Sequence, residues 1–154
     1  MTGLFIGIAG VALSVALAGI GSSLGIRYAA EAANAAMIEE PKNFGKYLVL
    51  TALPGTQGIY GFVIAFLAMT QLLSVETVSV ASGLSVFFAC LPMGLAGLFS
   101  GVYQGKVTAA GINMTVKHPD QSGKALVLGV FVEFYAILGF VISIMLVQNA
   151  KLFA

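Results

Sequence analysis

The stretch GVFVEFYAILGFV, residues 129–141, places one carboxylate, Glu133, in the middle of an apolar run. The nearest basic residues along the chain are Lys124 and Lys151. A charged side chain at the centre of a membrane-spanning helix costs about 2.5–3.5 kcal/mol. A carboxylate in such a place is by default a functional group, so this stretch predicts a membrane-spanning helix with a functional carboxylate at its centre.

The composition of the chain argues against a soluble protein. Of 154 residues, 59% are hydrophobic and 8% are charged, whereas a soluble domain carries about 25% charged residues. The mean hydropathy is +1.01. The net charge is +1, and no basic cluster indicates a nucleic-acid partner. The single cysteine, Cys90, cannot form an internal disulfide.

Four apolar runs reach the length of about 20 residues that a membrane-spanning helix needs. They cover residues 3–36, 44–73, 80–116 and 122–150. Pro41 and Pro119 lie in two of the polar breaks and end the preceding helices, because proline cannot continue the backbone hydrogen-bond pattern. We therefore expect an all-α membrane protein with one domain over residues 1–154, in which neighbouring spans run antiparallel.

Basic residues gather on one side of the predicted domain. They lie toward the loop between the first two spans and the loop between the last two, and only Lys151 lies at the other end. The residues on the first side are Arg27, Lys42, Lys46, Lys106, Lys117 and Lys124. Since loops rich in Lys and Arg face the cytoplasm, we expect both loops inside the cell and both termini outside.

The two halves of the chain match each other in one register. Residues 61–64 and residues 139–142 both read GFVI, 78 positions apart (61 to 139). At the same offset, without gaps, Pro41 matches Pro119. Further pairs in this register are Gly45 with Gly123 and Ser22 with Ser100. The match predicts a tandem duplication of one helical hairpin, whose copies have the same topology.

The predicted repeats cover about residues 1–73 and about residues 80–150, at the offset of 78. In this register the position that corresponds to Glu133 is Gly55. One hairpin therefore carries the carboxylate, and the other carries a polar, helix-breaking segment, LPGTQG, at residues 53–58.

Five polar side chains fall at one depth in the predicted membrane. They are Thr56, Gln57, Tyr60, Gln104 and Glu133. Counting about 1.5 Å per helical residue places Gln57, Gln104 and Glu133 roughly 14–20 Å from the nearest loop lysine, near the middle of a hydrocarbon core about 30 Å thick. Several oxygens at one level suit a dehydrated monovalent cation, whereas a proton needs only the carboxylate. Pro54 frees one backbone carbonyl, which its position predicts to be that of Leu50.

Each neutral member of this set also has an ordinary structural explanation. Gln104 is equally suited to a hydrogen bond between helices, and Thr56 to a bond with its own helix. The ring of Tyr60 is suited to packing between helices while its hydroxyl makes a hydrogen bond. Glu133 differs, because a carboxylate in a membrane span needs a functional reason.

Small residues follow a second pattern on the first and third spans. Glycines recur there at intervals of four, a spacing that allows helix backbones to approach closely. The members of this pattern are Gly21, Gly25, Gly97, Gly101 and Gly105. The second and fourth spans carry bulkier residues such as Phe62 and Phe131. Thin helices on one side and thick helices on the other form a wedge, and wedges close into rings.

Three segments resemble the proteolipid (K or c) subunits of V-type rotary ATPases of the bacterial sodium-translocating kind. They read LPGTQGIYGFVIAFL (53–67), GLFSGVYQGKVTAAGI (97–112) and VEFYAILGFVISIMLV (132–147), and the resemblance spans nearly the whole chain. It implies a rotor ring of identical four-helix subunits in the cell membrane. Such a ring turns against a static membrane subunit and is driven by ATP hydrolysis on other subunits, so the chain itself is expected not to be an enzyme.

The resemblance also implies an ion site. Its ligands fall on the backbone carbonyl of Leu53 and on Thr56, Gln57, Gln104 and Glu133, with Tyr60 donating a hydrogen bond to the glutamate. This ligand set favours Na⁺ over H⁺ as the transported ion. We further expect an essential arginine on the static subunit, and central-stalk subunits docked on the two cytoplasmic loops.

Other functions fit the sequence less well. A proton-carrying rotor subunit is the nearest alternative, and the neutral oxygens beside Glu133 argue against it. A small multidrug transporter would need inverted or dual topology, which the parallel repeat disfavours. A purely structural four-helix membrane protein has no use for a carboxylate among amides. His118 lies in a loop and no nucleophile–base pair is visible, so an active site is not expected.

Overall fold

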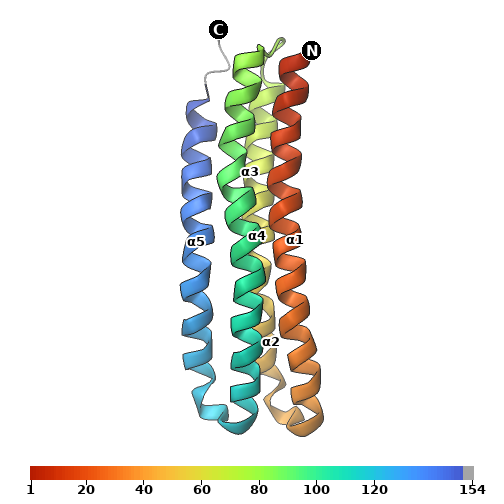
Figure 1. The fold of residues 1–154 in the computed structure, drawn as a ribbon, viewed down its shortest axis with the longest axis vertical. Helices are drawn as coiled ribbons and strands as arrows, with labels where there is room; N and C mark the ends of the chain where they lie inside the picture. The colour runs from red at the N-terminus through yellow and green to blue at the C-terminus, as the bar shows by residue number, and fades with distance from the viewer. Residues whose placement is uncertain (151–154) are drawn as a thin grey trace.

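The computed structural model describes residues 1–150, which form a bundle of helices without a strand (Figure 1). The α-helices are α1 (Thr2–Glu39), α2 (Phe44–Ala52), α3 (Thr56–Leu73), α4 (Val80–Lys117) and α5 (Ser122–Asn149). Short 3-10 helices, η1, η2 and η3, cover Pro41–Asn43, Leu53–Gly55 and Pro119–Gln121.

Within the described residues, four helical segments are long and apolar enough to cross a membrane. They are Thr2–Glu39, Pro41–Leu73, Val80–Lys117 and Pro119–Asn149. The predicted fold class, an all-α protein with four membrane-spanning helices, is confirmed. The second span is not one continuous α-helix, because η2 separates α2 from α3 at Pro54. This break lies within the helix-breaking segment that the sequence indicated.

The first two and last two spans are joined by turns of nearly the same shape. Glu40 precedes Pro41 with φ −141° and ψ 78°, and His118 precedes Pro119 with φ −134° and ψ 76°. Both residues lie outside the α-helical region, which is disfavoured for the residue before a proline. In each turn a 3-10 helix begins at the proline, so each chain reversal is made in a few residues.

The spans are arranged in two layers. α1 packs along α4, while α3 rests mainly on α1 and α5 mainly on α4. Figure 1 shows that the N-terminus and the α3–α4 turn lie at one end of the bundle, and the two proline turns at the other. The two loops toward which most of the basic residues lie therefore share one end. Lys151, which the orientation prediction placed at the opposite end, lies outside the described residues.

The closest contact between helices is the seam between α1 and α4. A Cβ atom on Gly101 would lie 2.6 Å from the backbone carbon of Gly21 and 2.9 Å from the backbone nitrogen of Ser22. Gly25 faces the backbone of Gly101 in the same way. All five glycines predicted to pack the ring lie on this seam within one chain: Gly21, Gly25, Gly97, Gly101 and Gly105. Their further role between subunits stays a prediction.

Replacing Gly101 with Leu is therefore expected to unfold the subunit before it affects assembly. Overpacking a core typically costs about 1–3 kcal/mol, and here the obstacle is backbone, which cannot rotate away. We expect a lower thermal unfolding midpoint by circular dichroism in mild detergent, together with loss of the ring. Gly45→Leu is the control, because a Cβ at Gly45 meets nothing within 4 Å. Equal midpoints for the two variants would contradict this packing.

Large aromatic side chains cover the outer layer. Phe62 and Phe66 on α3 are 59% and 58% exposed, and Phe131 on α5 is 57% exposed. Exposed apolar area of this kind is suited to lipid or to neighbouring subunits. Phe140 differs, because its ring stacks on that of Tyr60 with the ring centres 5.0 Å apart.

The two hairpins repeat one of their internal contacts. A Cβ on Gly61 would meet the side chain of Ala18 and the backbone oxygen of Ser14. A Cβ on Gly139, 78 positions later, would meet the side chain of Ala96 and the backbone oxygen of Pro92. These partners are also 78 positions apart (18 to 96, and 14 to 92).

Candidate cation site

A network of polar side chains crosses the bundle between α3, α4 and α5. Gln57 and Gln104 are 0% exposed and Glu133 is 8% exposed. Gln57 lies in the first turn of α3, directly after the break at η2, while Gln104 and Glu133 lie in the middle of α4 and α5. The break at Pro54 therefore brings the start of a helix to the depth at which the other two helices carry their polar groups.

Glu133 accepts hydrogen bonds on both carboxylate oxygens. The hydroxyl of Tyr60 donates to Oε1 over 3.0 Å, and Nε2 of Gln104 donates to Oε2 over 3.3 Å. Side chains from two other helices, α3 and α4, thus hold the two oxygens of this carboxyl group. Within residues 1–150 the structure contains one ion pair, between Arg27 and Glu31, so no basic side chain of this part of the chain neutralises Glu133.

The two glutamines connect Glu133 to the start of α3. Nε2 of Gln57 donates to Oε1 of Gln104 over 2.6 Å. Nε2 of Gln104 also donates to the backbone oxygen of Gly129 over 3.1 Å. The amide oxygen of Gln104 thus faces Gln57, while its nitrogen faces the carboxylate. A carbonyl oxygen has two lone pairs, so this oxygen retains one after the bond from Gln57.

Three oxygens meet where the second span breaks. The hydroxyl oxygen of Thr56 lies 3.2 Å from the backbone oxygen of Leu53 and 3.3 Å from Oε1 of Gln57. One hydroxyl hydrogen serves two acceptors there. A cluster of oxygens with few hydrogens favours a hard cation, which takes lone pairs and needs no donor.

Every residue that was predicted for the ion site belongs to this one network. Hydrogen bonds join them in the order Leu53, Thr56, Gln57, Gln104, Glu133 and Tyr60. The proline argument alone had indicated the carbonyl of Leu50, whereas the carbonyl beside Thr56 is that of Leu53, as the resemblance implied. The described residues hold no group of three or more His, Cys, Asp or Glu side chains suited to a transition metal.

Ser100 is a member of the network that the sequence reasoning missed. Its hydroxyl accepts from Nε2 of Gln57 over 3.1 Å and donates to the backbone oxygen of Val132 over 3.0 Å. The sequence offered one signal, since Ser100 pairs with Ser22 in the repeat register. Ser22 also lies near the network, where it accepts a bond from the backbone nitrogen of Gly58 over 2.7 Å.

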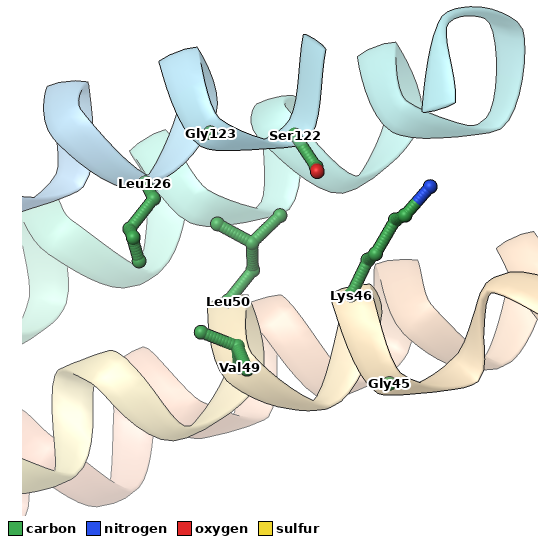
Figure 2. Close-up of a pocket in the computed structure, with 7 residues that line it drawn as sticks. All are labelled: Gly45, Lys46, Val49, Leu50, Ser122, Gly123 and Leu126. Atoms are coloured by element: carbon green, nitrogen blue, oxygen red, sulfur yellow. The ribbon is translucent and has the colours of Figure 1, made fainter. Parts of the chain in front are cut away.

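A separate groove of about 200 Å³ lies between α2 and α5 near the proline turns (Figure 2). Its lining residues are Gly45, Lys46, Val49, Leu50, Ser122, Gly123 and Leu126. None of them belongs to the polar network. Nζ of Lys46 on α2 donates to the backbone oxygen of Pro119 over 3.0 Å, which links α2 to the proline turn between α4 and α5. The buried network and the outer groove are therefore distinct features.

The fold is that of a protein with four helices able to span a membrane and a buried polar network between them, and comparison with known proteins gives the family. The family model for the C subunit of ATP synthase matches residues 2–68 and 87–146. The chain therefore belongs to the ATP synthase C-subunit family, as the resemblance in its sequence indicated, and this family forms oligomeric rings in ATPases.

Three members of rotary ATPases and ATP synthases are similar to this chain over more than nine-tenths of its length. The K subunit of the V-type sodium ATPase of Enterococcus hirae is 47% identical over 148 residues, which are 96% of this chain and 94% of the relative. The K subunit of the A-type ATP synthase of Methanocaldococcus jannaschii is 37% identical over 143 residues, 93% of this chain and 62% of that longer relative. The c′ subunit of the V-type proton ATPase of Eremothecium gossypii is 25% identical over 142 residues, 92% of this chain and 87% of the relative.

Proposed function

We propose that this chain is the ion-carrying rotor-ring subunit of a V-type sodium ATPase, and that Glu133 carries Na⁺ across the membrane. The observation that carries the proposal is the continuous hydrogen-bonded network from Leu53 to Glu133, in which the hydroxyl of Thr56 lies beside two further oxygens, those of the Leu53 backbone and the Gln57 amide. The similarity to the K subunit of the V-type sodium ATPase of Enterococcus hirae supports the choice of ion. ATP hydrolysis belongs to other subunits of the complex.

The proposed ligands of Na⁺ combine one anion with four neutral oxygens. They are the backbone oxygen of Leu53, the hydroxyl of Thr56, the amide oxygens of Gln57 and Gln104, and the carboxylate of Glu133. Each oxygen replaces a water that the ion loses on entering the membrane. Tyr60 acts on the carboxylate rather than on the ion, since its hydroxyl donates to Oε1.

Transport follows from the charge of this site. Bound Na⁺ neutralises Glu133, so the loaded site crosses the lipid-facing part of the rotation without the cost of a buried charge. Where the ring meets the static subunit, an arginine of that subunit displaces the ion and pairs with the carboxylate. The partner must supply this charge, because no cation of residues 1–150 pairs with Glu133.

The assembly is proposed to be a homo-oligomeric ring made of tandem duplicated hairpins, repeat 1 over about residues 1–73 and repeat 2 over about residues 80–150. The matched contacts of Gly61 and Gly139 support the duplication. Membrane lipids surround the ring in the cell membrane. The two proline turns dock the central stalk, since they are polar and lie at the end of the bundle toward which most of the basic residues gather.

Uptake of ²²Na⁺ by proteoliposomes that contain the whole complex tests the choice of ion. With ATP present, uptake is expected to persist in the presence of a protonophore, because a primary Na⁺ pump does not depend on a proton gradient. Abolition of uptake by the protonophore would instead support the proton-carrying alternative, in which Na⁺ moves secondarily.

The proposed orientation is tested by cysteine labelling. A cysteine at Asn43 or Gln121, in the two proline turns, is expected to react with an impermeant maleimide in inverted vesicles only. Thr77→Cys, in the turn at the other end, is the matched control and should react in right-side-out vesicles only. The native Cys90 is buried and gives little background. Labelling of Asn43→Cys from outside would reverse the orientation.

A further inference from the structure

Ser100 connects three helices beside the carboxylate without belonging to the proposed ligand set. It lies on α4, is 4% exposed, and contacts Gln57 of α3 and the backbone of Val132 of α5. Val132 immediately precedes Glu133 in the chain. A buried hydroxyl that makes two hydrogen bonds at this point is well placed to set the direction of its neighbours.

The single hydrogen of the Ser100 hydroxyl determines that direction. The backbone oxygen of Val132 only accepts, so the serine hydrogen is used on that bond. Toward Gln57 the serine therefore has only lone pairs to offer, and the end of the amide that faces it must be the nitrogen. The second hydrogen on this nitrogen is bonded to Oε1 of Gln104. Oε1 of Gln57 consequently points the other way, toward Thr56.

We propose that Ser100 is a positioning residue that makes the site a Na⁺ site by holding the amide oxygen of Gln57 toward Thr56 and Leu53. The inference rests on the proposed function, since it assigns a role within the same site. Without the serine oxygen, one amide hydrogen of Gln57 loses its acceptor, and the preference for one orientation of the amide weakens. A reversed amide would present hydrogens to the cation instead of a lone pair.

The test measures how much Na⁺ protects Glu133 from dicyclohexylcarbodiimide in purified rings, with modification quantified by mass spectrometry. Ser100→Ala is expected to raise the Na⁺ concentration for half-protection about fivefold, the scale of one neutral hydrogen bond. The rate of modification without Na⁺ should stay at the wild-type value, because the bonds to Glu133 come from Tyr60 and Gln104.

Ser22→Ala is the matched control. Ser22 is 6% exposed, occupies the same register in the first hairpin and bonds the backbone of Gly58 rather than an amide side chain. Ser22→Ala should lower the thermal unfolding midpoint about as much as Ser100→Ala does, but it should leave the Na⁺ concentration for half-protection of Glu133 unchanged. Equal shifts for Ser22→Ala and Ser100→Ala would overturn the inference, because they would reflect general loosening of the fold.

A double mutant shows whether Ser100 acts through Gln57. On the Gln57→Ala background, Ser100→Ala should cause no further shift in the Na⁺ concentration for half-protection, whereas a second fivefold shift would overturn the inference.

If Ser100→Ala does not assemble, the same measurement is made on Ser100→Thr and Ser100→Cys. Ser100→Thr keeps the hydroxyl and should be half-protected at the wild-type Na⁺ concentration. Ser100→Cys has a weakly accepting thiol and should need more Na⁺. Absence of protection in the wild-type ring would instead refute the proposed function, whereas wild-type protection with an unshifted Ser100→Ala would refute this inference alone.

Discussion

Replacing Glu133 with Gln is expected to reduce ATP-driven Na⁺ transport to background while the ring still assembles. The amide has the shape of the carboxylate but no charge, so only neutral oxygens remain to offset the dehydration of Na⁺. A charge pair at contact near a protein surface is worth about 4 kcal/mol, which corresponds to roughly a thousandfold loss of ion affinity. Uptake of ²²Na⁺ by proteoliposomes containing the complex measures the effect.

Glu31→Gln is the control for this substitution. Glu31 also lies in a predicted span, but it is exposed and bonded to Arg27, and exposed ion pairs contribute little. Transport by this variant should stay near the wild-type rate. Substantial uptake by a Glu133→Gln complex would show that the carrier is a different group.

Replacing Gln57 with Ala is expected to weaken Na⁺ affinity by roughly one to two orders of magnitude, the scale of interactions with a charged group. The change removes one proposed ligand oxygen and leaves Gln104 without the donor to its Oε1. The Na⁺ concentration that half-activates ATP hydrolysis by the complex should rise, and the maximal rate at saturating Na⁺ should change much less.

Gln71→Ala is the matched control for Gln57→Ala. Gln71 lies on the same helix but outside the network, and its Oε1 is buried without a hydrogen-bond partner in the structure. Half-activation should occur at the wild-type Na⁺ concentration. If Gln57→Ala behaved in the same way, the amide would be a packing group and not a ligand.

Much of the fold was predictable because membrane spans are defined by length and hydropathy. The four apolar runs and the prolines at Pro41 and Pro119 indicated the boundaries to within a few residues. Depth was predictable for the same reason, since the rise of an α-helix is constant. Counting residues from the loop lysines was enough to place Gln57, Gln104 and Glu133 at one level, where the structure joins them.

The features that were not predictable depend on how side chains are directed across helices. Ser100 looked like one of many small residues on a glycine-rich helix, and only its bonds to Gln57 and Val132 distinguish it. The direction of the Gln104 amide likewise depends on its neighbours. Gly101 lies against the backbone of Gly21 and Ser22 within the chain, a contact that spacing alone did not predict, because spacing does not say which helix a glycine faces. Its role between subunits stays a prediction.

Binding of Na⁺ by Glu133 in competition with protons is the basis of the proposed mechanism. The sharpest test is the rate at which dicyclohexylcarbodiimide modifies purified rings over a range of pH and Na⁺ concentrations. The reagent reacts with a protonated carboxyl in an apolar place, and Glu133 is expected to be the residue modified. Na⁺ should protect it, and half-protection should require less Na⁺ as the pH rises, because fewer protons compete for the carboxylate. Absence of protection at every pH, even at high millimolar Na⁺, would make this a proton site and refute the proposed Na⁺ mechanism.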